Sequence, residues 1–188
     1  SEPITLDIVP DTFPPSVLGT NVPDGSKRGQ AFRTIVIDFS EAMDTATLTA
    51  ENIHLIGPSG AVVPTSIQFR NGDRTVQLTY QQLEGGAQQI TINREAVTDR
   101  AGNALGTGQQ TISFSIVAAT AVWINPADGF WDVGSNWDTG MVPGQLDDVL
   151  LDVASGAKIT YRSGNTTIRS LSSNNPFEIT GGTLTVNE

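Results

Sequence analysis

The segment GFWDVGSNWDTG, residues 129–140, places tryptophan beside side chains that carry oxygen ligands. Trp131 and Trp137 lie six residues apart, and Trp123 lies just upstream. An exposed tryptophan ring beside polar groups can stack on a sugar, whereas a buried ring packs in a core with its indole N–H bonded to a carbonyl. We expect the second arrangement, in which the tryptophans cap the end of a core. Glycan contact is the alternative.

The same region is rich in carboxylate and amide side chains, which supply the oxygen ligands of calcium. The candidates are Asp128, Asp132, Asn136, Asp138, Asp147 and Asp148. Their order departs from the D-x-[DN]-x-[DN]-G pattern of an EF-hand, and Asp and Asn are also ordinary turn residues. A second candidate is DRAGN, where Asp99 and Asn103 more simply support a glycine-centred turn. We therefore expect no resident metal or other cofactor, and calcium is the one cofactor left open.

Residues suited to catalysis are scarce. The chain has no cysteine and one histidine, His54, which lies between Ile53 and Leu55 in an alternating segment. This alternation predicts that His54 faces outward from a sheet. GPSG is not the G-x-S-x-G nucleophile elbow, and the adjacent Asp147 and Asp148 would point to opposite faces of a strand rather than flank one glycosidic bond. We predict no catalytic residues and no enzymatic activity.

Composition and charge exclude several classes of function. The chain has 188 residues, of which 38% are hydrophobic and 16% charged, with a formal net charge of −10. This balance indicates a folded chain rather than a disordered one. Because nucleic-acid binding requires a positive surface, we expect no nucleic-acid partner. No apolar run approaches the roughly 18 residues that a membrane-spanning helix needs, so we expect no membrane span.

The first half of the chain has the two-residue alternation of antiparallel strands. The alternating segments are RTIVIDFS, RTVQLTY, QQITIN and TISFSIV, separated by turn signals at PDG, GPSG, NGD and GG. In the first segment, Ile35, Ile37 and Phe39 share the face that we expect to be the core. Seven or eight short strands over about 115 residues predict a β-sandwich. A short helical turn is expected over Thr45–Ala50, capped by Asp44 or by its own first residue.

These strands carry motifs with a resemblance. FSEAMDTATLTAENIHLIGPSG is followed by a TVQL strand, an ITI strand and VTDRAGNAL ahead of a final SFSIV strand. From Pro14 to Val117, this order resembles the bacterial Ig-like domain found in surface-layer proteins. The most specific parts are FSEAMD, residues 39–44, and DRAGN, residues 99–103. The resemblance implies a sandwich of seven or eight strands that serves as a spacer or adhesive module without a catalytic site.

Beyond the small, uncharged segment AATA, residues 118–121, the pattern changes. Short apolar pairs recur with glycine and asparagine between them, namely Val149/Leu151, Ile159/Tyr161, Ile168/Leu171, Phe177/Ile179 and Leu184/Val186. A spacing of about seven to ten residues suits a solenoid, in which each coil buries its face against the next. The ending ITGGTLTVNE stops within this pattern, so we expect the natural protein to continue past Glu188. The start, SEPITLDIVP, is neither a signal peptide nor a methionine start, so the chain is expected to be an excised piece or a mature product.

The second half also carries a resemblance, in Trp123, in GFWDVGSNWDTGMVPGQLDDVLLD and in the closing GGTLTV. Over about residues 121–188 it resembles the opening segment of the passenger-type β-helices of bacterial autotransporter and haemagglutinin-like adhesins. That family begins with a tryptophan and then G-x-W, N-W, G-x-x-P and D-x-V. The matching residues are Gly129, Trp131, Asn136, Trp137, Gly140, Pro143, Asp148 and Val149. The resemblance implies the first coils of a right-handed β-helix.

These patterns predict an all-β chain with two parts. Residues 1–118 are expected to form an Ig-like antiparallel β-sandwich, and residues 119–188 the start of a β-helix or solenoid with a tryptophan-rich cap. We interpret the chain as a non-catalytic segment of a large bacterial cell-surface adhesin, extracellular, acting as a spacer and stalk module. Its expected partners are neighbouring domains of a longer surface protein, with host or matrix glycans or proteins as further candidates.

Two alternative functions stay open from the sequence. The chain could be a carbohydrate-binding accessory module of a secreted polysaccharide-degrading enzyme, with the tryptophans as its platform. It could also be a surface-layer or matrix protein whose function is self-assembly.

Overall fold

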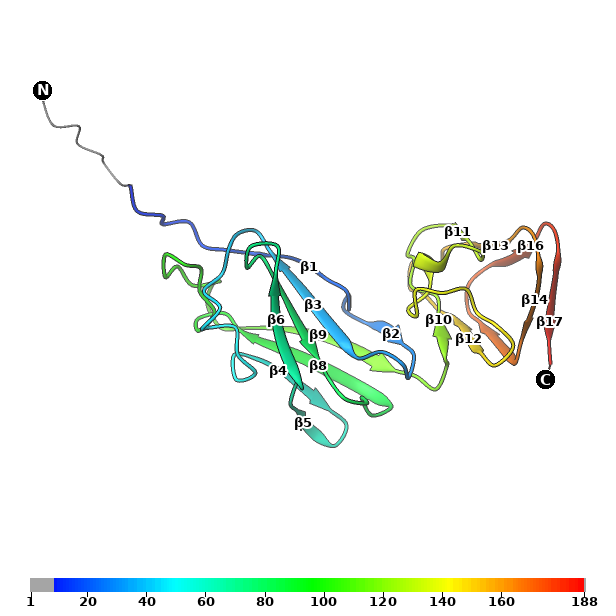
Figure 1. Ribbon diagram of the computed structural model, residues 1–188, viewed down its shortest axis with the longest axis horizontal. Coiled ribbons are helices and arrows are strands. Elements are labelled where there is room, and N and C mark those ends of the chain that lie inside the picture. Colours follow the sequence, from blue (N-terminus) through cyan, green and yellow to red (C-terminus); the bar gives the residue numbers. More distant parts are fainter. Residues whose placement is uncertain (1–8, 188) are drawn as a thin grey trace, which may run out of the picture.

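The computed structural model describes residues 9–187. The first predicted part therefore includes residues 1–8, and the second includes Glu188, which lie outside the described residues. The described chain consists of β-strands and one short 3-10 helix, η1(Gly134–Asn136), so the predicted all-β fold class is confirmed. Figure 1 shows a sandwich built from β1 to β9 and, beside it along the long axis, a smaller unit built from β10 to β17. No helix among the described residues is long and apolar enough to cross a membrane.

The first unit, the sandwich, has nine strands in two sheets. These strands are β1(Val17–Thr20), β2(Ser26–Arg28), β3(Thr34–Phe39), β4(Ile53–Gly57), β5(Gly60–Val62), β6(Ser66–Arg70), β7(Thr75–Thr79), β8(Gly86–Asn93) and β9(Gln109–Ile116). The sheets have the orders β1-β3-β7-β6 and β2-β9-β8-β4-β5, and β2 pairs parallel with β9 while the other pairs are antiparallel. The sequence predicts seven or eight strands because β2 and β5, with three residues each, are too short to show alternation.

The core of the sandwich lies between the two sheets and follows the predicted alternation. Ile35 and Ile37 of β3 are fully buried, and Phe39 is 2% exposed, which confirms this face of the strand. Complete burial of such a side chain stabilises a fold by about 1.5–3 kcal/mol. Across the sheet, Ile35 and Ile37 pair with Leu78 and Val76 of β7, which are also buried.

The expected helical turn over Thr45–Ala50 is instead a series of hydrogen-bonded turns. Asp44 does cap it, because its Oδ1 accepts the N–H of Ala46 at 3.0 Å. However, the carbonyl oxygen of Thr47 accepts a hydrogen bond from the side-chain Nδ2 of Asn52 at 2.9 Å. Side-chain bonds of this kind compete with the backbone ladder that a helix would need.

The second unit consists of short strands in three parallel sheets. The strands are β10(Ala121–Val122), β11(Gly129–Phe130), β12(Asp148–Leu151), β13(Ile159–Tyr161), β14(Asn165–Ile168), β15(Ser170–Ser173), β16(Phe177–Ile179) and β17(Thr183–Val186). The sheets have the orders β10-β12-β15, β11-β13-β16 and β14-β17. The chain therefore visits the sheets in turn and comes back to the first, and Figure 1 shows the three sheets around a common interior.

The predicted apolar pairs face this interior. Val149, Leu151, Ile159, Tyr161 and Ile168 are at most 2% exposed. The later pairs are less buried, since Ile179 is 52% exposed and Val186 is 41% exposed. These two residues lie on β16 and β17, which pair with a neighbouring strand on one side only among the described residues.

Residues 118–121 connect β9 to the second unit and are bonded to both units. The carbonyl oxygen of Ala119 accepts the N–H of Gln30 in the first unit at 3.2 Å. The N–H of Thr120 donates to the carbonyl oxygen of Asp148 in the second unit at 2.9 Å. The connection is therefore fixed at both ends rather than free to swing.

Candidate functional site

The three tryptophans lie together at the start of the second unit. Trp123 follows β10, Trp131 follows β11 and Trp137 follows η1, and each is 1% exposed. The ring of Trp137 meets Trp123 at a centroid distance of 5.2 Å and an interplanar angle of 89°, and it meets Trp131 at 4.7 Å and 73°. Edge-to-face contacts of this kind contribute to stability beyond the area that they bury.

Two of the three indole N–H groups donate to backbone carbonyls, as the capping hypothesis predicts. Trp123 Nε1 donates to the carbonyl oxygen of Asn125 at 2.8 Å, and Trp137 Nε1 donates to that of Trp131 at 2.9 Å. Trp131 Nε1 differs from the expectation, because it is buried and has no acceptor among the described residues. Its ring packs against the aromatic rings of Trp137 and Phe177, whose carbon faces offer no strong acceptor.

The chain around Trp137 covers the outer edge of β10. An antiparallel bridge joins Trp123 to Trp137, and the N–H of Asp138 donates to the carbonyl oxygen of Val122 at 2.9 Å. Because β12 pairs only with the other edge of β10, these contacts protect an edge that would otherwise be open. The tryptophans thus close one end of the second core, and none of the three presents a free ring face.

The exposed aromatic ring of this segment is Phe130, which is 43% exposed. The guanidinium carbon of Arg162 lies 3.9 Å from the centroid of this ring. Arg162 also donates from Nε to Oδ1 of Asp132 at 3.1 Å and from Nη2 to Oδ2 at 3.0 Å. A cation therefore covers one face of Phe130, and a sugar would have to displace it to stack there.

The six calcium candidates between residues 128 and 148 are bonded within the chain. Asp132 and Asp148 pair with Arg162 and Arg169. The other four accept hydrogen bonds. Asp128 accepts from Lys158 N, and Asn136 Oδ1 accepts from Asn125 Nδ2. Asp138 accepts from Val122 N and Gly29 N, and Asp147 accepts from Gly144 N and Thr120 Oγ1. Within residues 9–187, their carboxylates do not converge as the ligands of one ion would.

Asp147 lies just before β12 and Asp148 begins it, and their carboxylates bind different partners. Hydrogen bonds from the side chains of Arg169 and Ser170 hold the pKa of Asp148 below its usual value. Asp147 instead accepts from Thr120 Oγ1 at 2.8 Å. The two carboxylates are therefore occupied separately.

Asp99 organises the DRAGN turn, as the sequence predicts. Its Oδ1 accepts the N–H groups of Ala101 and Asn103, both at 2.8 Å, and its Oδ2 accepts Asn103 Nδ2 at 2.8 Å. Gly102 has a φ of 91°, a conformation that favours glycine. Burial raises the pKa of the Asp99 carboxyl, but these hydrogen bonds together lower it by more than burial raises it. The pKa of Asp99 is therefore below its usual value.

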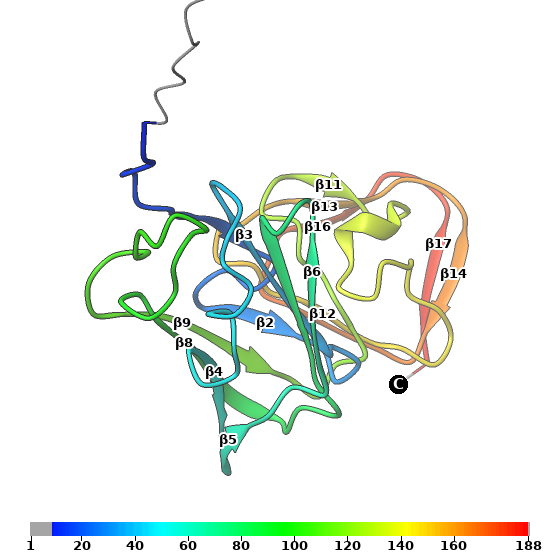
Figure 2. The same ribbon diagram turned by 60° about the vertical axis from the view of Figure 1, so that its left-hand side comes forward.

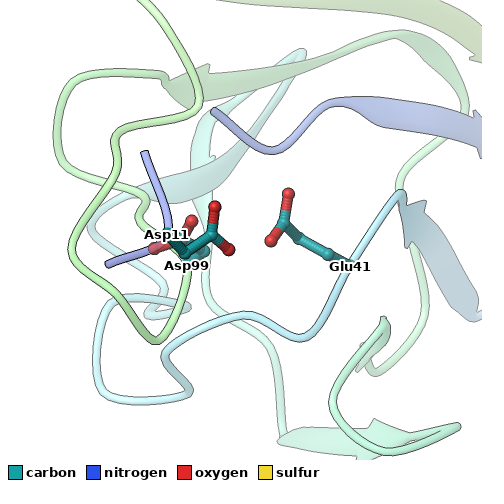
Figure 3. Close-up of side chains that lie close together, drawn as sticks. All are labelled: Asp11, Glu41 and Asp99. Atoms are coloured by element: carbon teal, nitrogen blue, oxygen red, sulfur yellow. The ribbon is translucent and has the colours of Figure 1, made fainter. Parts of the chain in front are cut away.

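Asp99 also belongs to a cluster that sequence reasoning missed. Figure 3 shows the carboxylate of Glu41 facing Asp11 and Asp99, and one oxygen from each lies within 4.8 Å of the others. Asp11 precedes β1, Glu41 follows β3 and Asp99 lies between β8 and β9. Glu41 and Asp99 belong to the two most specific motifs of the sequence, but only the fold joins these motifs, through an antiparallel bridge between Met43 and Asp99.

The electrostatics of this cluster are those of crowded negative charges. Burial and the charges of Asp11 and Asp99 raise the pKa of Glu41, and Arg74 lowers it in part. Calcium takes six to eight oxygen ligands, whereas both oxygens of Asp99 already accept hydrogen bonds. The cluster can attract a cation, but it supplies only a few of the oxygen ligands that a calcium ion needs.

His54 lies on the outer face of β4, as predicted, because its neighbours Ile53 and Leu55 are buried in the core. GPSG forms the turn between β4 and β5, in which Gly57 pairs with Gly60. Neither feature belongs to the tryptophan cap or to the acidic cluster. The absence of catalytic residues stays a prediction.

Comparison with protein families finds a match over the first unit. The sequence pattern of the family described as bacterial Ig-like domain matches residues 11–116, which is more than half of the chain. This range agrees with the resemblance over 14–117 and ends before the second unit. The resemblance of residues 121–188 to a passenger-type β-helix receives no support from it. Comparison with curated proteins finds no match.

Several solved structures are similar at low identity. The S-layer protein rSbsC(31-844) is 20% identical with a TM-score of 0.40, covering 55% of this chain and 14% of that one. CopC from Methylosinus trichosporium OB3b is 12% identical with a TM-score of 0.43, covering 54% and 92%. The E. coli alpha-2-macroglobulin is 17% identical with a TM-score of 0.42, covering 65% and 8%. The chain thus spans a small part of the S-layer protein, and such values identify no common activity.

Proposed function

The chain belongs to the bacterial Ig-like domain family through residues 11–116, and from this premise we propose that it is a non-catalytic structural segment of a bacterial cell-surface protein. In this role the sandwich is a spacer, and the second unit is the beginning of a stalk. The finer part of the proposal is that the whole protein is a large extracellular adhesin. Its partners would then be neighbouring domains of that protein and, at a distance from this segment, host or matrix molecules.

The observation that carries the proposal is the end-to-end order of the two units. Figure 1 shows the sandwich and the second unit placed one after the other along the long axis, and Figure 2 shows the same two units turned by 60°. The buried hydrophobic residues form a separate cluster in each unit. The connection over residues 118–121 is bonded to both units. A spacer must hold what it carries at a distance from its anchor, and a fixed connection between compact units serves that purpose better than a flexible linker.

We infer that the second unit is the first part of a β-helix. Two features support this inference. Ile159 pairs with Phe177 and Asn165 with Thr183, so the last coil adds 18 residues in parallel register. The tryptophan cap closes the other end of the stack, as a solenoid end requires.

The spacer role can be tested with the chain fixed to a gold surface through its C-terminus and a fluorophore at its N-terminus. Quenching of the fluorophore by the gold should be weaker than with a Gly/Ser linker of the same number of residues, because the free end of a flexible coil returns to the surface. Equal quenching with both would contradict the spacer role. Specific binding of glycans by the chain alone would instead favour a carbohydrate-binding module.

Self-assembly, as in a surface-layer or matrix protein, is the second candidate function. A specific observation favours it, since Met141 and Leu146 in the loop before β12 are 69% and 80% exposed. Val142 beside Met141 is also 39% exposed, and apolar side chains that form one contiguous exposed patch mark a contact surface for another protein. Concentration-dependent polymers of the full chain that are lost in a Met141→Ser, Leu146→Ser variant would support self-assembly over the spacer role alone.

A further inference from the structure

Asp138 lies between the two units, and its two carboxylate oxygens serve different units. Oδ2 accepts the N–H of Gly29 in the sandwich at 2.7 Å. Oδ1 accepts the N–H of Val122 in β10 of the second unit, also at 2.7 Å. Hydrogen bonds to a charged acceptor are stronger than those between neutral groups. One side chain therefore joins the backbones of both units.

Gly29 is packed so closely that a side chain at this position would push its neighbours, Asp138 among them, out of place. A Cβ at this position would lie 2.8 Å from the carbonyl oxygen of Ala119 and 2.9 Å from Oδ2 of Asp138. Gly29 is not among the glycines with a positive φ, so its backbone conformation is open to other residues. The need for glycine here comes from the close approach of the two units.

Two further contacts cross the same junction. The N–H of Gln30 donates to the carbonyl oxygen of Ala119 at 3.2 Å. The ammonium of Lys27 in β2 forms an ion pair with Asp152, which follows β12. The contacts of residues 27–30 thus reach the connecting segment, the tryptophan-capped edge and the end of β12.

Asp138 also belongs to the tryptophan cap. It directly follows Trp137, and its own N–H donates to Val122 on the covered edge of β10. Movement of Asp138 away from Gly29 would therefore disturb the chain that protects this edge. The position of the sandwich and the stability of the cap are linked through one residue.

We propose that Asp138 is a tether that fixes the orientation of the second unit on the Ig-like unit, and that the Ig-like unit thereby stabilises the tryptophan cap. This inference rests on the contacts at the junction and is independent of the proposed surface role. It predicts that the two units move as one body and that loosening the junction destabilises the second unit before the first.

The chain is well suited to a distance measurement because it contains no cysteine. Gln89 on the sandwich and Thr180 on the second unit are exposed, and cysteines at both positions can carry spin labels. Pulsed electron paramagnetic resonance on the full chain should then give one narrow distance distribution. Asp138→Ala removes both hydrogen bonds and Gly29→Ala forces the units apart, so each should broaden or shift this distribution.

Matched controls separate the junction from general destabilisation. Asp128→Ala also removes a carboxylate that accepts a backbone N–H, from Lys158, but both residues belong to the second unit. Gly19→Ala also adds a Cβ to a glycine without a positive φ, yet nothing lies within 4 Å of that Cβ. Neither control should alter the distance distribution.

The stability of the cap has its own readout. All three tryptophans lie in the second unit, so tryptophan emission during urea denaturation follows that unit alone. Asp138→Ala should lower the midpoint of this transition and speed hydrogen exchange at the Gly29 N–H about tenfold or more, as expected for the loss of a charge-assisted hydrogen bond. Exchange in β8 and β9 of the sandwich should stay unchanged.

Two results would overturn the tether. One is a broad distance distribution in the unaltered chain. The other is a distribution that stays narrow and unshifted in both Asp138→Ala and Gly29→Ala. If the second unit of the Asp138→Ala variant does not fold, the distance distributions of Gly29→Ala and Asp138→Asn test the proposal instead. Asp138→Asn keeps one acceptor oxygen, so it should give an intermediate broadening, and a distribution equal to that of the unaltered chain would count against the proposal.

Discussion

Trp123 and Trp137 are joined by an antiparallel bridge, and their rings meet edge to face with centroids 5.2 Å apart. The thirteen residues between them therefore form a closed loop whose two ends are held together by aromatic packing. Both rings are 1% exposed, so this pair contributes to the core and not to a ligand surface. The ring of Trp131 also packs against Trp137, which completes the cap.

Replacing Trp137 by alanine should cost about 3–5 kcal/mol of stability in the second unit, the usual penalty for losing a buried large aromatic. Trp131→Ala should cost a similar amount. The measurement is urea denaturation followed by circular dichroism, with the emission of the remaining tryptophans as a second probe. Phe130→Ala is the control, because Phe130 is 43% exposed and its loss should cost far less.

In the unaltered chain, tryptophan emission should be blue-shifted and weakly quenched by acrylamide. Red-shifted emission that responds to added polysaccharide would contradict the cap and support a sugar platform.

Replacing Phe39 by alanine should destabilise the sandwich by about 3–5 kcal/mol, because the substitution leaves a cavity between the sheets. Phe69→Ala on β6 is a matched control, since Phe69 is 37% exposed. Denaturation of the full chain, read by hydrogen exchange in β3 and β7, measures both. A cost below about 1 kcal/mol for Phe39→Ala would mean that the cavity closes or that this face is not the core.

Residues 1–118 should fold without the second unit. The buried hydrophobic cluster of the sandwich draws only on residues between Val22 and Ile116, so its core is complete without later residues. Expression of this fragment should give an all-β circular dichroism spectrum and a cooperative thermal transition. A molten or helical product would show that the sandwich depends on the rest of the chain.

The stability of the sandwich should fall in acid through Asp99. Its pKa lies below the usual value, so the ionised carboxyl stabilises the folded state. That contribution is complete above the unfolded pKa of about 3.9 and is lost as the pH falls through the lower folded pKa. The Asp99→Asn variant should therefore be less stable than the unaltered chain at pH 7. The difference between their free energies of unfolding should become smaller below about pH 3.9.

A gap in unfolding free energy that stayed constant from neutral pH to the most acidic conditions would mean that the charge of Asp99 has no part in it. Carboxyl chemical shifts measured by NMR across the same range give the pKa directly.

Calcium should have little effect on the chain. Asp11, Glu41 and Asp99 offer few free oxygens, and the acidic residues of the tryptophan loop are bonded elsewhere. A site with a Kd of about 0.1 mM would add about 1.4 kcal/mol at 1 mM calcium. We expect the free energy of unfolding to be the same in the presence of a chelator and in about 1 mM calcium. A rise that disappears in Glu41→Gln would place a calcium site at the acidic cluster.

The sequence by itself determined the features that depend on local periodicity. In a strand, successive side chains point to opposite faces, so alternation alone assigned Ile35 and Phe39 to the core and His54 to the outer face. The DRAGN turn was equally local, because Asp99 bonds residues only two and four positions away. Burial of the tryptophans was predicted, while the unbonded N–H of Trp131 was not.

Tertiary structure alone decided which distant residues meet. Asp138 and Gly29 are 109 positions apart, and Lys27 and Asp152 are 125 apart. Pairing at such separations depends on strand register and on how the units dock, neither of which leaves a periodic trace in the sequence. For the same reason, the acidic cluster and the contact of Arg162 with Phe130 became visible only in the fold. The sequence placed most of the strands and turns, and the packing of the two units then brought Asp138 to the backbone of Gly29.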